Sequence, residues 1–387
     1  MAPLSTALAL GLLAVSLGAQ ASAQAAPLDP SAGYTAARSR PVTHDVELTA
    51  VVTAPSGTKR LRIWVPIPPS DAAQSVESSA FETYPESVAP EFATEPVFGN
   101  RFAYFEFKDP KGAQMVRHRL RITTHELRWN VDSAKVMSAG PWPASFEPFL
   151  RSESQAVVVG DEVTKLARDV APRRGDALGD LRGVMDWIQQ NLRYDHAEAS
   201  LQASSQWALA KRAGHCSDYH SLCSAMTRAL GYPARVTYGI SMLPKASPSH
   251  CKAEVFLPPY GWVSFDLSET QKLCEKITNE TSLERGRRAA LVEAAKRRLL
   301  AGYRENLWFL QTRGTDYDLA PKAARKVAVV RTIYAEADGR ALPEPDPSDP
   351  HKREFAWMTL HRFLPTSEGT RQFTDVATLD EFLKPQK

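Results

Sequence analysis

A cysteine stands where a loop is expected to enter a helix, in the run Gly214-His215-Cys216-Ser217-Asp218. Unpaired backbone N–H groups and the helix dipole at such a point favour a thiolate over a thiol. The thiolate is the nucleophilic form of cysteine, and the same amides can hold the oxyanion of a tetrahedral intermediate. The position therefore predicts that Cys216 is a nucleophile.

A histidine and an aspartate stand at the two ends of a pair of short apolar segments that are expected to be neighbouring strands. They are His250 and Asp266, and the stretch 257–262 between them contains two prolines and a glycine. These residues are typical of a turn. The imidazole and the carboxylate can therefore lie side by side on adjacent strands.

The same region offers a rival set of metal ligands, which are Cys216, His220, His250 and Cys251. Zinc takes thiolate and imidazole ligands in a tetrahedron, and Cys216 and His220 lie about one helical turn apart. However, neighbouring residues of a strand point to opposite faces, so Cys251 is expected to point away from His250. We therefore predict no metal site and no cofactor.

Three segments together resemble the transglutaminase-like superfamily. They are Gly214–Leu222 with its continuation to Arg235 (GHCSDYHSL and RALGYPAR), Ser249–Val255 (SHCKAEV) and Tyr260–Asp266 (YGWVSFD). Cys216 and His250 are 34 residues apart and His250 and Asp266 are 16 apart, and this order is more specific than any one segment. The resemblance covers residues 150–275, and residues 64–68 (WVPIP) and 99–100 are more weakly similar to the β-rich N-terminal region of exported bacterial members.

The resemblance implies a Cys-His-Asp triad that acts on peptide amide bonds. Cys216 would attack the carbonyl, His250 would act as the base, and Asp266 would orient the histidine. Water would then release the acyl group from the thioester, as in a protease or amidase, whereas a lysine amine would form a crosslink.

Two features near the triad leave questions open. Lys252 stands two positions after the histidine, where the family usually has an aromatic residue, commonly Trp. Trp207 and Gln206 are candidates, by their position alone, for the second oxyanion donor.

Helical periodicity begins near residue 150, so a transglutaminase-like catalytic domain is expected over residues 150–275. Its apolar positions recur every three or four residues; they are Val163, Leu166, Ala167 and Val170, then Leu178, Leu181, Met185, Ile188 and Leu192. A third helix is expected over 217–230, before Gly231 and Pro233, and strands over 235–240, 251–257 and 262–266. A nucleophile helix packed on an antiparallel sheet is an α+β, papain-like/transglutaminase-like core.

Residues 40–130 are expected to form an N-terminal β-sandwich domain, because apolar residues alternate over 43–53, 59–67 and 115–127. Pro55-Ser56-Gly57 favours a hairpin between the first two strands. Residues 276–387 are expected to form a C-terminal extension. It would contain a charged helix over 284–305, a strand over 326–336, and a tail after four prolines between Leu342 and Pro350.

The composition favours neither a nucleic-acid partner nor a disulfide-rich fold. With 47 basic and 44 acidic residues, the net charge of +3 does not favour nucleic acid, and it does not identify the partner. A protein or peptide substrate is what the resemblance implies. The four cysteines lie in the middle of the chain and do not form a disulfide scaffold, although a bridge between Cys251 and Cys274 is left open.

The first 23 residues are expected to be a signal peptide. About ten apolar residues, 8–17, precede the small residues Ala21-Ser22-Ala23, and this stretch falls short of the ~20 residues that span a bilayer. We therefore expect export to the periplasm or the extracellular space, without stable insertion in a membrane.

Two functions fit these observations. The first is cysteine-dependent hydrolysis or transamidation of peptide amide bonds, on a protein or on cell-wall peptide. The lack of an obvious calcium loop in the sequence favours a calcium-independent hydrolase. The alternative is a catalytically idle transglutaminase-like scaffold that binds peptide or cell-wall polymer.

Overall fold

A computed structural model describes residues 28–137, 140–171, 175–244, 248–343, 356–366 and 368–384. The expected signal peptide over residues 1–23 and most of the proline-rich stretch after Leu342 lie outside the described residues. Within these ranges, no helix combines the length and the apolar character that crossing a membrane requires.

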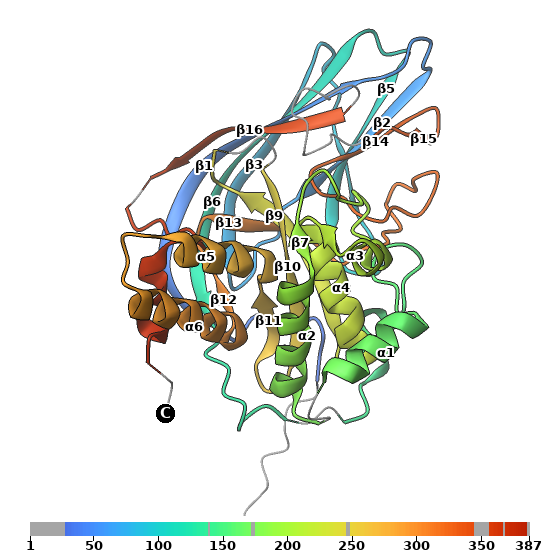
Figure 1. The fold of residues 1–387 in the computed structure, drawn as a ribbon. Helices are drawn as coiled ribbons and strands as arrows, with labels where there is room; N and C mark the ends of the chain where they lie inside the picture. Colours follow the sequence, from blue (N-terminus) through green and yellow to red (C-terminus); the bar gives the residue numbers. More distant parts are fainter. Residues whose placement is uncertain are drawn as a thin grey trace, which may run out of the picture.

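Two antiparallel sheets pack face to face and form a β-sandwich (Figure 1). The first contains β12 (Tyr303–Arg304), β6 (Ala113–Arg128), β1 (Ala37–Thr53) and β16 (Ala356–Pro365), with β3 (Gln74–Tyr84) also on β6. The second contains β15 (Arg340–Ala341), β14 (Tyr334–Ala337), β2 (Arg60–Ile67), β5 (Arg101–Lys108) and β4 (Glu91–Thr94). The predicted alternation holds, since Val116, Leu120 and Ile122 of β6 are buried while Arg117, Arg119 and Arg121 lie on the other face.

The predicted hairpin over Pro55-Ser56-Gly57 is wrong. The turn is present, with the Thr58 amide donating to the Pro55 carbonyl at 3.2 Å. However, β1 pairs with β6 and β16, whereas β2 pairs with β5 and β14. Both strands point their apolar residues into one core, so they face each other across the sandwich instead of lying edge to edge.

A third antiparallel sheet carries the candidate residues. Its order is β11 (Gly261–Phe265), β10 (Ser249–Leu257), β9 (Ala234–Ser241) and β13 (Trp308–Arg313). The helices α1 (Asp161–Val170), α2 (Ala177–Asn191), α3 (Ser205–Lys211) and α4 (Cys216–Ala229) gather on one side of it (Figure 1). The short strands β7 (Arg193–Tyr194) and β8 (Ala213–Gly214) pair in parallel beside them, and a 3-10 helix spans Ala144–Phe149. This is the α+β core that the sequence predicts.

Helix α4 is buried from Ser217 to Arg228, because it packs between the sheet and the other helices. Cys223 is part of this core, as expected for a small apolar residue. The helix stops where predicted: Gly231 has a φ of +90° and its amide donates to the Arg228 carbonyl at 2.9 Å. Glycine adopts this left-handed backbone conformation without the steric cost that other residues incur.

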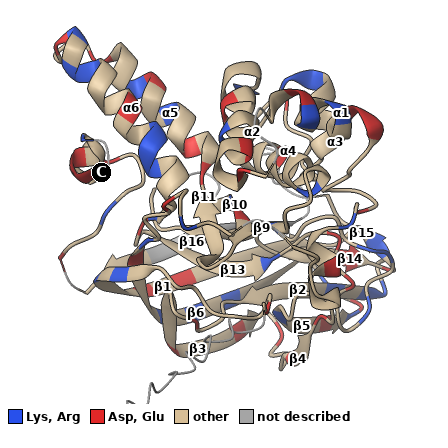
Figure 2. Ribbon diagram, turned by 90° about the horizontal axis from the view of Figure 1, so that it is seen from below, with Lys and Arg blue, Asp and Glu red and all other residues tan. Residues whose placement is uncertain are grey.

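The C-terminal part of the chain contains a pair of helices that projects from the molecule. Helices α5 (Leu267–Asn279) and α6 (Arg285–Ala301) pack against each other and against the 3-10 helix Val376–Phe382. Figure 2 shows this pair projecting from the rest of the molecule, with charged residues along it. The expected strand over 326–336 is shorter than predicted, since β14 covers Tyr334–Ala337.

The centre of the third sheet depends on a glycine. A Cβ atom on Gly239 would lie 2.1 Å from the carbonyl oxygen of Phe309 and 2.5 Å from the Trp308 ring. No side-chain rotation relieves a clash with a backbone carbonyl. We expect Gly239→Ala to lower the free energy of unfolding by about 1–3 kcal/mol, measured by urea denaturation.

The matched control is Gly286→Ala in α6, where the same Cβ would meet nothing within 4 Å. This variant should be neutral or gain up to about 1 kcal/mol, because alanine favours a helix over glycine. Equal stability of Gly239→Ala and the unchanged protein would contradict the close approach of β9 and β13.

Candidate active site

Cys216 is the first residue of α4, and a hydrogen-bonded cap fixes the loop that leads to it. His215 is the N-cap residue, and its backbone amide donates to the Asp218 carboxylate at 3.1 Å. The His215 side chain accepts from the backbone of Asp218 in return. Gly214 is required before them, because a Cβ there would lie 2.6 Å from the Asp218 carboxylate. Asp218 thus has the supporting role that its place in a first helical turn indicates.

His250 and Asp266 are in direct contact. Nε2 of His250 lies 2.7 Å from Oδ2 of Asp266, and both side chains are buried. Asp266 is also the N-cap of α5, where its Oδ1 accepts from the amide of Glu269 at 3.1 Å. With Nε2 bound to the carboxylate, Nδ1 is the ring nitrogen available to Cys216.

The thiol of Cys216 is half-buried and is hydrogen-bonded to Cys251 and His250. The bond from Cys251 and then the bond from His250 hold the pKa of the Cys216 thiol well below its ordinary value, although burial opposes this. Burial also opposes protonation of His250, but Asp266 and Cys216 outweigh it and raise the pKa of His250 to about 9. The arrangement therefore favours a thiolate beside an imidazolium near neutral pH.

His220, a member of the rival metal-ligand set, is a buried neighbour of these groups. Its Nε2 lies 3.1 Å from the amide of Leu267, and its Nδ1 lies 3.3 Å from Sγ of Cys251. Burial lowers the pKa of His220 to about 4, so the ring is neutral. A backbone amide can only donate, so Nε2 carries no proton and Nδ1–H donates to the sulfur of Cys251.

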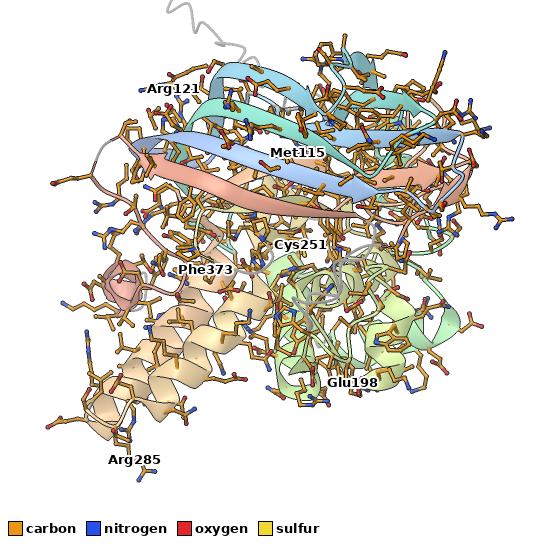
Figure 3. The ribbon with its side chains drawn as sticks, turned by 90° about the horizontal axis from the view of Figure 1, so that it is seen from above. Met115, Arg121, Glu198, Cys251, Arg285 and Phe373 are labelled. Carbon is orange, nitrogen blue, oxygen red and sulfur yellow. The ribbon has the colours of Figure 1, made fainter. Side chains whose placement is uncertain are left out.

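The sequence predicts that Cys251 points away from His250 along β10, but the structure brings both side chains to the thiol of Cys216. The start of α4 lies close enough to β10 for both His250 and Cys251 to contact Cys216. Figure 3 places Cys251 where the helices meet the strands.

Both ring nitrogens of His220 are engaged with protein atoms. In the described residues, no three His, Cys, Asp or Glu side chains are arranged to hold a metal ion. All four cysteines are free, so Cys251 does not bridge to Cys274.

Two further residues contact the site and were not assigned to it from the sequence. Lys252 is fully buried and its Nζ lies 2.6 Å from Oδ2 of Asp266. The hydroxyl oxygen of Tyr194 accepts from the backbone N–H of Cys216. Lys252 was visible as a departure from the family pattern, whereas Tyr194 lies 22 residues before Cys216 without a distinguishing motif.

The structure gives other contacts to the remaining candidates. The indole N–H of Trp207 donates to the carbonyl of Glu198 at 2.7 Å, and Gln206 is exposed on α3. Their role as oxyanion donors stays a prediction. Glu254 pairs with Arg235 at 2.7 Å and accepts from the Tyr34 hydroxyl at 2.6 Å.

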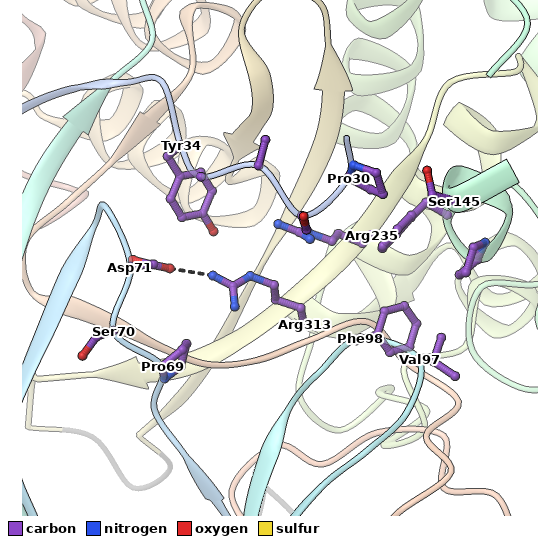
Figure 4. Close-up of a pocket in the computed structure, with 15 residues that line it drawn as sticks. Pro30, Tyr34, Pro69, Ser70, Asp71, Val97, Phe98, Ser145, Arg235 and Arg313 are labelled. Carbon is purple, nitrogen blue, oxygen red and sulfur yellow. Dashed lines mark hydrogen bonds and ion pairs between the residues drawn. The ribbon is translucent and has the colours of Figure 1, made fainter. Parts of the chain in front are cut away.

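A cavity of about 360 Å³ lies at the far end of the β9–β10 pair (Figure 4). Arg235 and Arg313 line it, together with Tyr34 and Asp71. Arg313 pairs with Asp71 at 2.5 Å, and Arg235 with Glu254. The two arginines are thus neutralised by carboxylates. His250 pairs with Gly239 of β9, which lies four residues along the strand from Arg235. At a rise of ~3.3 Å per residue, this distance along the strand separates the cavity from the Cys216 site.

Comparison with known proteins agrees with this architecture. The family model of the transglutaminase-like superfamily matches residues 164–267. An "Uncharacterized protein" of Haemophilus influenzae is 23% identical over 346 residues, covering 77% of this chain and 86% of that protein.

A solved structure described as "a Putative Cysteine Protease from Cytophaga hutchinsonii" superposes with a TM-score of 0.57 at 15% identity, covering 87% of this chain and 94% of that chain. The periplasmic domain of TgpA from Pseudomonas aeruginosa gives a TM-score of 0.31 at 12% identity, covering 65% and 92%, which is too low to support an argument. The family model and the shared fold agree with the order of α4, β10 and β11. Residues 164–267 therefore match the transglutaminase-like superfamily, and the chain shares its fold with the structure from Cytophaga hutchinsonii.

Proposed function

We propose that this chain is a cysteine-dependent acyl-transfer enzyme that cleaves peptide amide bonds, with Cys216, His250 and Asp266 as its catalytic triad. The observation that carries the proposal is the continuous contact from Asp266 to His250, at 2.7 Å, and on to the Cys216 thiol at the start of α4. This is the order of contacts that a thiol nucleophile, a base and an orienting carboxylate require.

The chemistry follows from these contacts. The Cys216 thiolate attacks the carbonyl carbon, and the carbonyl electron pair moves onto oxygen, where backbone amides at the start of α4 can stabilise it. The C–N bond then breaks as His250 gives its proton to the leaving nitrogen. His250 next takes a proton from water as the water oxygen attacks the thioester carbonyl. The C–S bond then breaks, which frees the acid and restores the Cys216 thiolate beside the imidazolium.

Hydrolysis is the reaction we propose, because the sequence has no obvious calcium loop and a water molecule needs no acceptor site. A protein or peptide is the proposed substrate, including cell-wall peptide. The expected signal peptide over residues 1–23 supports a periplasmic or extracellular location for this activity. A lysine amine in place of water would make the same thioester a route to a crosslink.

We expect iodoacetamide to label Cys216 quickly at pH values well below the ordinary thiol pKa of ~8.5. The pKa of Cys216 is lowered, so its thiolate persists as the pH falls, and labelling decreases when the pH passes below that lowered value. His250→Ala should slow labelling at pH 6 by roughly tenfold or more, because it removes the imidazolium. Mass spectrometry of pH-dependent labelling measures both rates.

Two cysteines of the same chain serve as internal controls. Burial raises the pKa of Cys223 to about 12 and that of Cys274 to about 11, so both should label slowly at pH 6. Labelling of Cys216 no faster than Cys274, and unchanged in His250→Ala, would refute the enzyme and leave the idle scaffold as the function.

Cys251 should supply part of the thiolate stabilisation. Its sulfur accepts from His220, so its own S–H proton is free to donate to Cys216. We expect Cys251→Ala to raise the pH midpoint of Cys216 labelling by about 1 unit, since hydrogen bonds to charged groups are worth about 1.5–3 kcal/mol.

The conservative variant Cys251→Ser keeps a donor in the same place and should restore most of the shift. If Cys251→Ala and Cys251→Ser both left the midpoint unchanged, the contact between the two sulfurs would have no part in activation. The midpoint is read from alkylation, so it needs no substrate.

A further inference from the structure

Lys252 is a buried cation beside the proposed triad, at a position where the resemblance leads one to expect an aromatic residue. Its side chain has no exposed surface. Removing an ammonium group from water costs several kcal/mol unless carboxylates compensate it. Nζ of Lys252 lies 2.6 Å from Oδ2 of Asp266 and 2.9 Å from Oε2 of Glu305. Two carboxylates therefore form ion pairs with this one cation.

The shared oxygen links this cation to the proposed base. Oδ2 of Asp266 lies 2.7 Å from Nε2 of His250 and 2.6 Å from Nζ of Lys252. His250 and Lys252 are two residues apart on β10, so both point to the same face of the sheet. His250 and Lys252 therefore share a single carboxylate oxygen.

Aromatic rings and the C-terminal segment enclose the cation. Nζ of Lys252 lies 5.3 Å from the centre of the Trp308 ring and 5.0 Å from that of Phe373. The indole N–H of Trp308 donates to the carbonyl of His250 at 3.1 Å. Figure 3 shows Phe373 near the C-terminal 3-10 helix, beside the zone where the helices meet the strands. Cation–π contacts of this kind favour an ammonium in a dry site.

We propose that Lys252 is a positioning residue of the active site, which with Glu305 as its counter-charge fixes the Asp266 carboxylate against His250 and sets how strongly that carboxylate supports the imidazolium. This inference rests on the proposed function, because it takes His250 as the base. It extends the triad by a buried ion pair, Lys252 and Glu305, that touches no substrate.

The sign of the effect follows from the charges. The ammonium of Lys252 withdraws part of the Asp266 charge from His250 and repels the imidazolium directly, so it makes protonation of His250 harder. The carboxylate of Glu305 offsets the ammonium and makes protonation easier. Removing the ammonium of Lys252 should therefore raise the pKa of His250, and removing the carboxylate of Glu305 should lower it.

Other charged or titratable groups face this part of the site from each neighbouring element. They are Cys216 and His220 on α4, Cys251 on β10, Asp266 at the start of α5 and Arg298 on α6. Cys216 is hydrogen-bonded to His250 and is itself titratable, so it is replaced by serine in the test. The others are unchanged in every variant compared.

The test is the pKa of His250, measured by NMR in the full chain with ¹⁵N-labelled histidine in a Cys216→Ser background. The His250 signal is assigned by its loss in His250→Gln. Lys252→Met should raise this pKa by about 1 unit, and Glu305→Gln should lower it by about 1 unit. The double variant Lys252→Met with Glu305→Gln removes no net charge and should return the pKa close to that of the Cys216→Ser protein.

Opposite shifts that cancel in the double variant support the proposal. Shifts in the same direction, or none, overturn it, because a merely structural role moves the unfolding free energy and not the sign of a titration. If Lys252→Met alone does not fold, Glu305→Gln and the double variant still give one predicted shift and its cancellation. The titration uses a protein without the thiol, so its result is separate from the outcome of Cys216 labelling.

Discussion

A carboxylate without access to water lies at the start of α5, and four donors from two segments converge on it. His250 and Lys252 of β10 donate to Oδ2 of Asp266, while the hydroxyl of Ser268 and the amide of Glu269 donate to Oδ1. A buried carboxylate that loses such partners is destabilised by several kcal/mol. The end of β11, the start of β10 and the first turn of α5 therefore have to be ordered together.

The same carboxylate joins two kinds of structure that would otherwise be independent. As the N-cap it accepts from the Glu269 amide of α5, and as an ion-pair partner it holds His250. Burial raises the pKa of Asp266, but His250 and Lys252 outweigh burial and hold it well below its ordinary value. The carboxylate therefore stays ionised, and an ionised Asp266 gives both the cap and the imidazole a fixed orientation.

Local patterns in the sequence predicted the elements that carry the site. Cys216 at a helix start, the stop at Gly231 and the three strands that follow depend on short-range rules, and the structure has all of them. The approach of His250 to Asp266 followed from a turn between neighbouring strands and from a family resemblance. Such features are encoded within a few residues of one another.

What the sequence did not predict depends on contacts between distant segments. Lys252 meets Glu305 across 53 residues, and neither periodicity nor a motif marks this pairing. Strict alternation along a strand predicted Cys251 on the face opposite His250, but the start of α4 lies close enough to β10 for both side chains to contact Cys216. The hairpin over residues 55–57 failed for a similar reason, since two amphipathic strands can pair edge to edge or pack face to face with the same pattern.

The sandwich is built from both ends of the chain, with the third sheet and helices α1 to α6 encoded between them. β1 gains β16 as a neighbour and β2 gains β14, and in both cases the paired residues lie at least 270 positions apart in the chain. During synthesis, the first half of the sandwich therefore exists with two unpaired strand edges until the last quarter of the chain emerges. Open edges invite pairing with other chains. This chain order leaves the early nascent polypeptide with two exposed strand edges until β14 and β16 have been made.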